Sequence, residues 1–193
     1  MPELILASTS PARRALMDAL GVPYRAVRPE FEEEMEGARD PVALARSLAL
    51  GKARAVAAKF PDALVLGADQ VCAFEDEIWG KPKDLADARD KLRRLSGRTH
   101  ALVCGLALVG PGFEQVVDER SELTMYALSP EELEGYLATR EWEGCAGGYR
   151  VEERGLALFR EIRGDLTAVR GLPMLAVVRM LREAGVRFFG ATA

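Results

Sequence analysis

The sequence predicts an α/β protein with a mixed sheet, one that contains both parallel and antiparallel strands. Segments with strand-like and helix-like patterns alternate through the first half of the chain, which is typical of parallel strands joined by helices. Residues 99–128 instead read as two long strands around a Gly-Pro-Gly turn. Such a hairpin is antiparallel, so the sheet that contains both patterns is mixed. The 193 residues suffice to bury a core, and we expect a single domain over residues 1–193.

Sequence patterns define the elements of the first half. In order, they predict a strand at residues 3–7, a helix at 11–20, a strand at 23–29, an acidic loop at 30–37 and a helix at about 41–60. A Ser-Thr-Ser-Pro sequence caps the first helix, Pro11 lies in its first turn and Gly21 ends it. Alanine and leucine at helical spacing define the second helix.

The second half continues with shorter elements. The patterns predict strands at residues 63–68 and 70–74 joined directly at Asp69, a capped helix at 84–97, the hairpin, a helix at 129–139, two strands or a loop and a strand at 148–164, a tight polar connection at 164–173, and a closing helix at 172–185. No repeat, low-complexity tract or linker interrupts this order, which agrees with one domain.

Composition limits the partners and the compartment. The net charge of −4 argues against binding of nucleic acid or of an anionic membrane, because both require a basic surface. No stretch approaches a membrane span, and the N-terminal apolar run is too short for a signal peptide. Cys72, Cys104 and Cys145 are scattered, and His100 is the only histidine, which argues against a zinc site. Reduced thiols fit a cytoplasmic protein.

Several common catalytic motifs are missing from the sequence. Neither Gly51-Lys52 nor Gly80-Lys81 has the flanking residues of a P-loop, and the dinucleotide and nucleophile-elbow motifs do not occur. A catalytic triad would depend on His100, which lies in an alternating strand and fits a hydrogen-bonded structural residue better. Carboxylates and cations remain, and metal-assisted phosphoryl chemistry uses that combination.

The loop before the first helix is a candidate anion site. Backbone N–H groups at a helix N-terminus bind anions, Ser8 and Ser10 can add hydroxyl donors, and Arg13 lies in the first turn. An ordinary helix cap with a solvated arginine explains this segment equally well. Lys52, on a mostly apolar helix, either points into a cleft or is a surface lysine with a buried stem. Lys81 lies between a glycine and a proline, which fix its backbone.

Asp69 has the most informative position in the chain. An aspartate at the end of an apolar strand is a rigidly held metal ligand or general base. The alternative is a turn aspartate, although Gln70 after it does not favour a tight hairpin. Glu33 is a candidate second metal ligand, or else part of a solvated acidic face. The glycine-rich loop at residues 143–155 can approach a planar base closely, with Glu152 accepting hydrogen bonds from it.

Seven segments resemble, in order, the signature segments of the Maf nucleotide pyrophosphatases. They are LASTSPARRALM, ALGKARAVA, LGADQVC, GKP, LSGRTH, AGGYRVEERG and GLPM. Each is weak alone, but the ordered set is specific and spans nearly the whole chain. The resemblance implies a mixed α/β fold related to the inosine-triphosphate pyrophosphatases, with two lobes around a deep cleft. It also implies hydrolysis of a nucleoside triphosphate to the monophosphate and pyrophosphate with Mg²⁺ or Mn²⁺.

The resemblance implies roles for individual residues. Four positions match the phosphate contacts of the family: Ser8, Arg13, Lys52 and Lys81. Asp69 matches the proposed general base and Glu33 matches an acidic position after the second strand, so both are expected metal ligands. Cations would neutralise the triphosphate while a base-activated water attacks the α-phosphorus. The sequence leaves open whether Asp69 deprotonates this water or mainly holds the metal.

Three positions bear on the choice of base. Gln70 and Glu152 resemble the corresponding residues of the branch that hydrolyses 7-methyl-GTP. A glutamate suits this substrate because its carboxylate can accept hydrogen bonds from both N1–H and N2–H of guanine. Ala12 departs from that branch, which tends to carry a bulky residue there. We therefore expect 7-methyl-GTP or a related modified nucleotide as the substrate of a house-cleaning enzyme. Hydrolysis of dTTP and UTP is the alternative within the family.

Two other classes of function stay open, as does the assembly state. A nucleotidyltransferase also uses a strand–loop–arginine phosphate site, although the usual glycine-rich N-terminal loop is missing here. A nucleotide-sensing regulator without turnover fits the link between the family and septum formation. The family is often dimeric, so the resemblance allows a homodimer.

Overall fold

The computed structural model describes residues 2–35 and 37–189. The strands are β1 (Leu4–Ala7), β2 (Arg25–Ala26), β3 (Leu64–Phe74), β4 (Glu77–Trp79), β5 (Thr99–Gly110), β6 (Phe113–Met125) and β7 (Phe159–Arg163). The helices are α1 (Pro11–Leu20), α2 (Pro41–Ala57), α3 (Leu85–Leu95), α4 (Pro130–Ala138), the 3₁₀ helix η1 (Arg154–Leu158), α5 (Leu166–Val169) and α6 (Met174–Glu183). Across the described ranges, no helix has the length and apolar character needed to cross a membrane.

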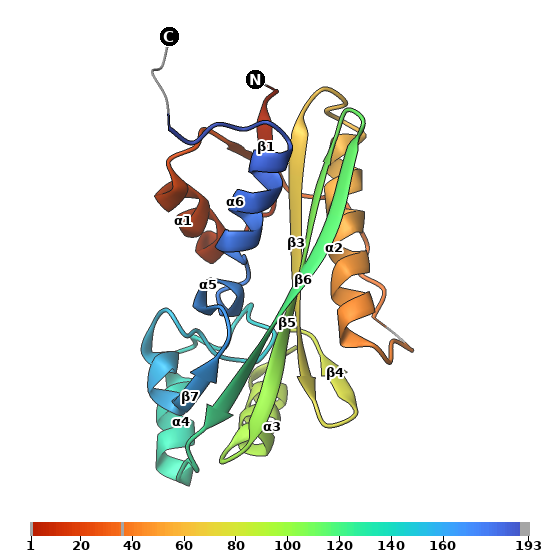
Figure 1. Ribbon diagram of the computed structural model, residues 1–193. Coiled ribbons are helices and arrows are strands. Elements are labelled where there is room, and N and C mark those ends of the chain that lie inside the picture. Colours follow the sequence, from red (N-terminus) through yellow and green to blue (C-terminus); the bar gives the residue numbers. More distant parts are fainter. Residues whose placement is uncertain (1, 36, 190–193) are drawn as a thin grey trace.

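The strands of the described chain form one mixed sheet. Their order is β2-β1-β3-β5-β6-β7, with β4 also paired to β3. β1 is parallel to β2 and β3, whereas the other pairs are antiparallel. The long strands β3, β5 and β6 run through the whole molecule (Figure 1). The predicted fold class is therefore confirmed, including the turn at Pro111 and Gly112 between β5 and β6.

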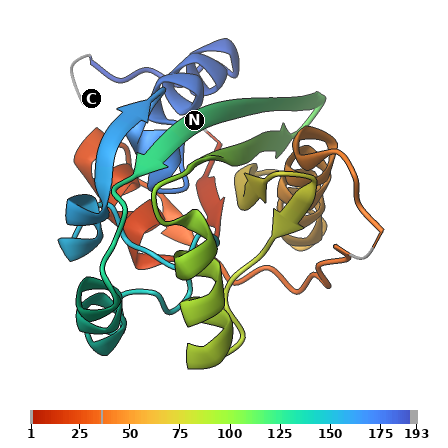
Figure 2. The ribbon, with the colours of Figure 1, turned by 90° about the horizontal axis from the view of Figure 1, so that it is seen from below.

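Different helices cover the two faces of the sheet. In the upper half of Figure 1, α2 covers one face, and α1 and α6 cover the other (Figures 1 and 2). Odd-numbered strand residues such as Ile5 and Val65 pack with Ala53 of α2. Even-numbered residues such as Leu6 and Leu66 pack in the cluster that includes α1 and α6. A separate core joins α3 and α4 to the lower strand ends, so two lobes share the same long strands.

One edge of β3 is paired in two separate parts. β1 pairs with residues 64–67, and β4 pairs with residues 72–74. In the described structure, no strand lies beside residues 68–71 on this edge. The reason is that β1 ends at Ala7, where the chain turns toward α1 with Ser10 as its N-cap. The edge of the sheet is therefore open at this point.

Asp69 lies inside β3, not between two strands as predicted. The predicted strands at residues 63–68 and 70–74 form one continuous strand, in which Asp69 pairs with Gly105 of β5. The interpretation as a turn aspartate is therefore wrong. Asp69 and Gln70 point to opposite faces of the sheet, because successive side chains of a strand alternate.

Helix α2 approaches the sheet closely because two glycines face it. A Cβ added at Gly67 would lie 2.4 Å from the carbonyl oxygen of Ala49, and one added at Gly105 would lie 2.1 Å from that of Ala45. These distances leave no room for a side chain. The short separation brings Lys52 of α2 against β3.

Other differences from the prediction concern short elements. The strand expected at residues 23–29 is limited to β2, and α2 ends at Ala57 rather than near residue 60. Neither β4 nor α5 was predicted, because three or four residues carry too little periodicity. Residues 148–164 contain turns, η1 and β7, which agrees with the loop-and-strand alternative.

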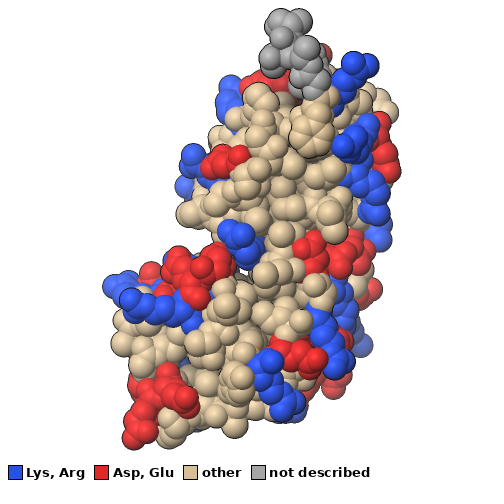
Figure 3. All heavy atoms as spheres, turned by 60° about the vertical axis from the view of Figure 1, so that its left-hand side comes forward, with Lys and Arg blue, Asp and Glu red and all other residues tan. Residues whose placement is uncertain are grey.

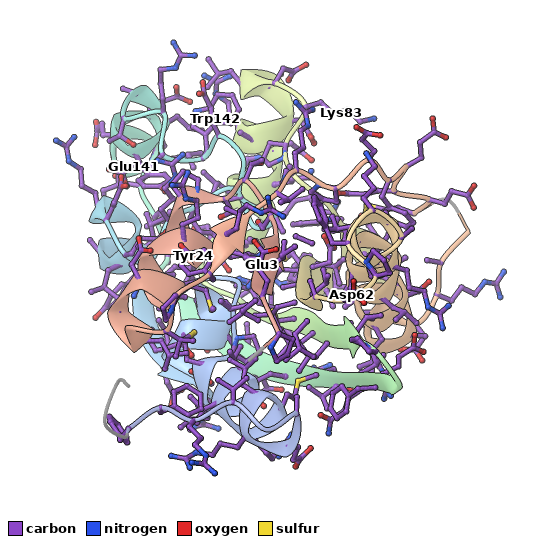
Figure 4. All side chains as sticks on the ribbon, turned by 90° about the horizontal axis from the view of Figure 1, so that it is seen from above. Glu3, Tyr24, Asp62, Lys83, Glu141 and Trp142 are labelled. Atoms are coloured by element: carbon purple, nitrogen blue, oxygen red, sulfur yellow. The ribbon has the colours of Figure 1, made fainter. Side chains whose placement is uncertain are left out.

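The glycine-rich loop after α4 is anchored at both ends. Glu141 and Trp142 lie beside α4 (Figure 4). Trp142 donates from Nε1 to the carbonyl oxygen of Leu137 at 3.2 Å, and the buried Glu141 accepts from the backbone N–H of Gly155 at 3.1 Å. These bonds fix the position of residues 143–155.

His100 is buried and hydrogen-bonded, as predicted. Its Nε2 lies 2.5 Å from the hydroxyl oxygen of Tyr149, and its Nδ1 has no partner among the described residues. Burial lowers the pKa of His100 to about 4. The imidazole is therefore neutral at pH 7.

We expect Gly105→Ala to lower the free energy of unfolding by roughly 1–3 kcal/mol, because the new methyl group overlaps the backbone of α2. Gly135→Ala in α4 is the matched control, since nothing lies within 4 Å of its added Cβ. Alanine is the better helix former there, by about 1 kcal/mol. Urea denaturation measures both changes. Wild-type stability in Gly105→Ala would contradict the close approach of α2.

The pKa of His100 also predicts how stability changes with pH. It is about 4 in the folded protein against 6.5 ordinarily, so the unfolded chain binds more protons between these values. The stabilisation that comes from keeping His100 neutral is present above pH 6.5. As the pH is lowered toward 4, the free energy of unfolding should fall by about 3 kcal/mol.

The variant His100→Gln cannot titrate and should lack this component of the pH dependence. Urea denaturation of both proteins at several pH values isolates it, because the carboxylates contribute equally to each. Parallel stability profiles for wild type and variant would show that His100 titrates normally in the folded protein.

Candidate active site

A groove beside the open edge of β3 gathers the residues predicted to bind phosphate and one of the two predicted metal ligands, Glu33. It has a volume of about 410 Å³, and we call it the polar groove. The predicted residues that line it are Ser8, Arg13, Glu33, Lys52 and Lys81. Figure 3 shows basic and acidic side chains around a hollow at the waist between the two lobes. The structure thus brings together residues that lie far apart in the sequence.

Lys52 is buried at the base of the polar groove. Only 8% of Lys52 and 7% of Asp69 are exposed to solvent. The ammonium group donates a hydrogen bond to Oδ1 of Asp69 and lies 2.7 Å from Oε1 of Glu33. The interpretation of Lys52 as a surface lysine is therefore wrong. A buried ammonium needs compensating charge, and the two carboxylates supply it.

Packing of the acidic segment on α2 brings Glu33 to Lys52. A Cβ added at Gly51 would lie 2.3 Å from the ring of Phe31, so this ring lies directly on the helix backbone. Met35 packs against the apolar cluster between α2 and the sheet. The described part of the segment has no helix or strand, as predicted. Its apolar residues hold it in place, while Glu33 faces the groove.

The pKa of Glu33 reflects the positive charge around it. Burial raises this pKa, but the hydrogen bond and charge of Lys52, with the charges of Lys81 and Arg13, outweigh burial and hold it below its ordinary value. Lys81 is exposed at the rim of the groove. Glu33 is therefore an anion at neutral pH, surrounded by cations.

The loop between β1 and α1 forms one wall of the polar groove. Ser8 is buried, and its Oγ accepts from the backbone N–H of Ser10 at 3.1 Å. Ser10 caps α1, so the helix-cap interpretation is correct for this residue. Arg13, however, is not simply solvated, because its Nε donates to the carbonyl oxygen of Gly171 at 2.7 Å. The wall therefore combines a capped helix start with an arginine fixed by the C-terminal part of the chain.

Gln70 lies on the other face of β3 and holds α5. Its Nε2 donates to the carbonyl oxygens of Ala168 at 2.7 Å and Val169 at 3.0 Å. Carbonyl oxygens only accept, so these two bonds fix the orientation of the amide. Gln70 also lines the next cavity, and its Oε1 accepts no hydrogen bond from the described residues.

Two hollows continue from the polar groove and contain the predicted specificity residues. Their volumes are about 80 and 300 Å³, and we call them together the second pocket. Ala12 and Glu152 line both hollows, and Gln70 lines the smaller one. Ser10 lines the polar groove and both hollows, so the cavities adjoin at this residue.

Two arginines at these cavities were missed by the sequence reasoning. Arg28 lines the polar groove, and Arg170 lines both hollows of the second pocket. Arg28 lies in a segment predicted as a strand, and Arg170 follows α5, which was not predicted. The position of Arg170 directly before the Gly-Leu-Pro-Met segment was the available signal.

Glu33 and Asp69 are the candidate ligands for a divalent cation. Both carboxylates contact the ammonium group of Lys52, so their oxygens already surround one positive charge. In nucleotide sites, Mg²⁺ takes one or two carboxylates and completes its shell with phosphate oxygens and water. No group of three or more His, Cys, Asp and Glu side chains in the described ranges could hold a metal unaided. The two carboxylates therefore suit a metal that binds together with a triphosphate.

Comparisons with known proteins relate the whole chain to one family. The family model described as Maf-like protein matches residues 3–184. The 7-methyl-GTP pyrophosphatase of Xanthomonas campestris pv. campestris (strain 8004) is 44% identical over 187 residues, which cover 96% of this chain and 97% of the relative. The dTTP/UTP pyrophosphatase of Symbiobacterium thermophilum is 41% identical over 189 residues, which cover 98% of this chain and 97% of the relative.

The fold also has a solved counterpart. The structure of the Staphylococcus aureus Ham1 protein superimposes with a TM-score of 0.53 at 15% identity, covering 95% of this chain and 100% of that one. At this identity the likeness concerns the fold alone, and it supports the expected fold class. The family match, by contrast, covers residues 3–184, and the two relatives are 44% and 41% identical over nearly the whole sequence. The chain therefore belongs to the Maf-like protein family.

Proposed function

We propose that the chain hydrolyses a guanine-type nucleoside triphosphate, above all 7-methyl-GTP or a related modified nucleotide, between the α- and β-phosphates. As a member of its family the chain is a nucleotide pyrophosphatase, a hydrolase that acts on acid anhydrides. One observation supports the choice of substrate: the polar groove shares Ser10 and Arg13 with the adjoining hollow, which Gln70 and Glu152 line. The triphosphate would lie in the groove and the base in the pocket.

The charges of the polar groove suit a triphosphate. The cations that line it are Arg13, Arg28, Lys52 and Lys81. Cations fixed before the reaction stabilise the charge that develops on the departing pyrophosphate without having to reorganise. Ser8 and the backbone at the start of α1 add hydrogen-bond donors for phosphate oxygens.

Asp69 would act on the attacking water, a role supported by its contact with Lys52 at the polar groove. Its carboxylate accepts a proton from the water, whose oxygen then bonds to the α-phosphorus. The bond between this phosphorus and the bridging oxygen breaks, and the electron pair leaves with that oxygen as part of pyrophosphate. Lys52 compensates the charge of the buried Asp69 carboxylate while β3 keeps it rigidly in place.

Glu33 and Asp69 would also hold Mg²⁺ or Mn²⁺. When bound, such a cation neutralises charge on the phosphate oxygens and orients the triphosphate. The protein contributes two carboxylates on separate elements that meet at one point. Asp69 can serve as the base, as a metal ligand or as both, and Asp69→Asn alters the carboxylate that each role needs.

The second pocket favours a base that offers several hydrogen-bond donors. Glu152 and the Oε1 of Gln70 are acceptors, and guanine presents N1–H and N2–H together on its pairing edge. Uracil and thymine offer one donor between two acceptors, which an amide suits better than a carboxylate. The small side chain of Ala12 leaves room in the pocket, so dTTP and UTP belong in any substrate panel.

The proposal includes a cytoplasmic location and no binding of nucleic acid. All three cysteines, Cys72, Cys104 and Cys145, are free thiols, which fits the reducing cytoplasm. The net charge of −4 opposes binding of nucleic acid. A homodimer stays a prediction, which sedimentation of the purified protein would test.

Asp69→Asn should reduce hydrolysis by at least about a hundredfold, because a positioned general base typically contributes a hundredfold to ten-thousandfold. The measurement is release of pyrophosphate and monophosphate from 7-methyl-GTP, GTP, dTTP and UTP with Mg²⁺, with and without a chelator. Asp118→Asn is the matched control. It changes an aspartate on β6 that pairs with Arg46 outside the cavities, and it should retain near-native turnover.

The same panel separates the rival functions. Transfer of a nucleotidyl group to a second substrate would indicate a nucleotidyltransferase. Tight nucleotide binding by the wild type without products would indicate a sensing regulator. Near-native turnover by Asp69→Asn would remove this residue from the mechanism.

Glu152→Gln should shift the preference from guanine-type substrates toward pyrimidines, because an amide can both donate and accept. A shift of about tenfold or more in the ratio of kcat/KM for 7-methyl-GTP over UTP corresponds to the loss of one charged hydrogen-bond pair. Glu134→Gln, a surface residue paired with Arg89, is the control. An unchanged ratio in Glu152→Gln would refute the role of this carboxylate in base selection.

A further inference from the structure

Arg170 lines both hollows of the second pocket but has no part in the reaction described above. It follows the last residue of α5 and precedes Gly171. Arg13 and Arg150 also line the second pocket, but both donate to backbone carbonyl oxygens. Gln70 and Glu152 can accept hydrogen bonds from a base. A guanidinium group adds several donors and a positive charge.

The backbone on both sides of Arg170 is fixed by residues of the site. Gln70 holds the carbonyl oxygens of the two residues before it, and Arg13 holds that of Gly171 at 2.7 Å. The backbone N–H of Arg170 donates to the carbonyl oxygen of Leu166 at 3.3 Å. The side chain therefore extends from a rigid point at the pocket, as residues that select a ligand require.

The guanidinium group of Arg170 has unused hydrogen-bonding capacity. Its Nε is buried and has no partner among the described residues. Arg170 forms no ion pair with any described residue. Arg150, by contrast, pairs with Glu153 at 3.6 Å and donates to the carbonyl oxygen of Glu143 at 3.1 Å. Nε itself is shielded, but the terminal nitrogens of Arg170 have no hydrogen-bond or ion-pair partner among the described residues either, and the side chain lines the pocket. Because polar groups in folded proteins are nearly always hydrogen-bonded, these nitrogens are the donors available to an acceptor on the ligand.

We propose that Arg170 is a specificity-determining residue that donates hydrogen bonds to O6 and N7 of a guanine base. This inference rests on the proposed function and deepens it. Glu152 would accept from N1–H and N2–H, while Arg170 would donate to the opposite, acceptor-bearing edge. Arginine paired with O6 and N7 is a common and geometrically favourable contact to guanine.

7-Methyl-GTP would interact with Arg170 differently from GTP. Methylation of N7 removes one acceptor and places a positive charge on the base beside the guanidinium group. Arg170 would therefore limit the preference for the methylated, cationic base, which the negative charge of Glu152 favours. The balance between these two residues sets how strongly the enzyme distinguishes the two nucleotides.

The test compares kcat/KM for GTP, 7-methyl-GTP and 7-deaza-GTP in the wild type and in two variants. Arg170→Met removes the donors and the charge while keeping a long side chain, and Arg170→Lys keeps the charge without the planar fork. We expect the ratio of 7-methyl-GTP to GTP to rise at least about fivefold in Arg170→Met, the lower end for loss of a bidentate contact. Arg170→Lys should give a smaller rise.

The wild-type protein supplies a measurement that does not depend on the folding of a variant. 7-Deaza-GTP lacks the N7 acceptor but carries no added charge, so it should be hydrolysed several-fold less efficiently than GTP. Arg170→Met should lose this difference. Arg160→Met, an exposed arginine of β7 outside the cavities, is the control and should keep both wild-type ratios.

The outcomes separate this inference from the proposed function. Hydrolysis of guanine nucleotides with equal use of GTP and 7-deaza-GTP, or an unchanged ratio in Arg170→Met, would overturn the role of Arg170 alone. No hydrolysis of any guanine nucleotide by the wild type would overturn both. A uniform decrease for all substrates would indicate a structural role and would also overturn the proposal.

Discussion

Strand β3 is paired with β5 from Val65 to Ala73, but its other edge is paired with β1 and β4 only at the two ends. The register with β5 therefore fixes the open stretch between them. A shift of one residue would move every side chain to the opposite face and bury the wrong set. In the observed register, Asp69 faces α2 and Gln70 faces α5. One hydrogen-bonded register thus places the proposed general base and a proposed specificity residue on opposite faces of the sheet.

The cluster of Lys52, Asp69 and Glu33 depends on this register and on the close approach of α2. Gly67 and Gly105 allow the helix backbone to lie against the sheet, so a lysine on its inner face reaches the strand. Removing these charges from water is costly, and replacing a buried ion pair by apolar side chains often preserves or increases stability. Such a cluster is therefore weak evidence for stability and better evidence for a site that must hold charge in a fixed geometry.

Sequence patterns were sufficient for the long elements and for charges that interrupt them. Lys52 and Asp69 could be singled out because each breaks an apolar face or strand. The clamp formed by Gln70 could not be predicted, since its carbonyl partners lie 98 and 99 residues away and belong to a helix of four residues. Arg170 was missed for the same reason. Periodicity records which face of an element is buried, but not which distant segment covers that face.

The α5 turn connects the two parts of the site. Gln70 binds carbonyl groups within α5, and Arg13 binds the carbonyl group of Gly171 just beyond it. Both residues line the cavities and also fix the backbone that carries Arg170. A change at either one therefore alters its own contact with a nucleotide and the position of a third residue, so their effects are coupled. Under the proposed function, the choice of base would be a property of this connected set and not of the small side chain of Ala12 alone.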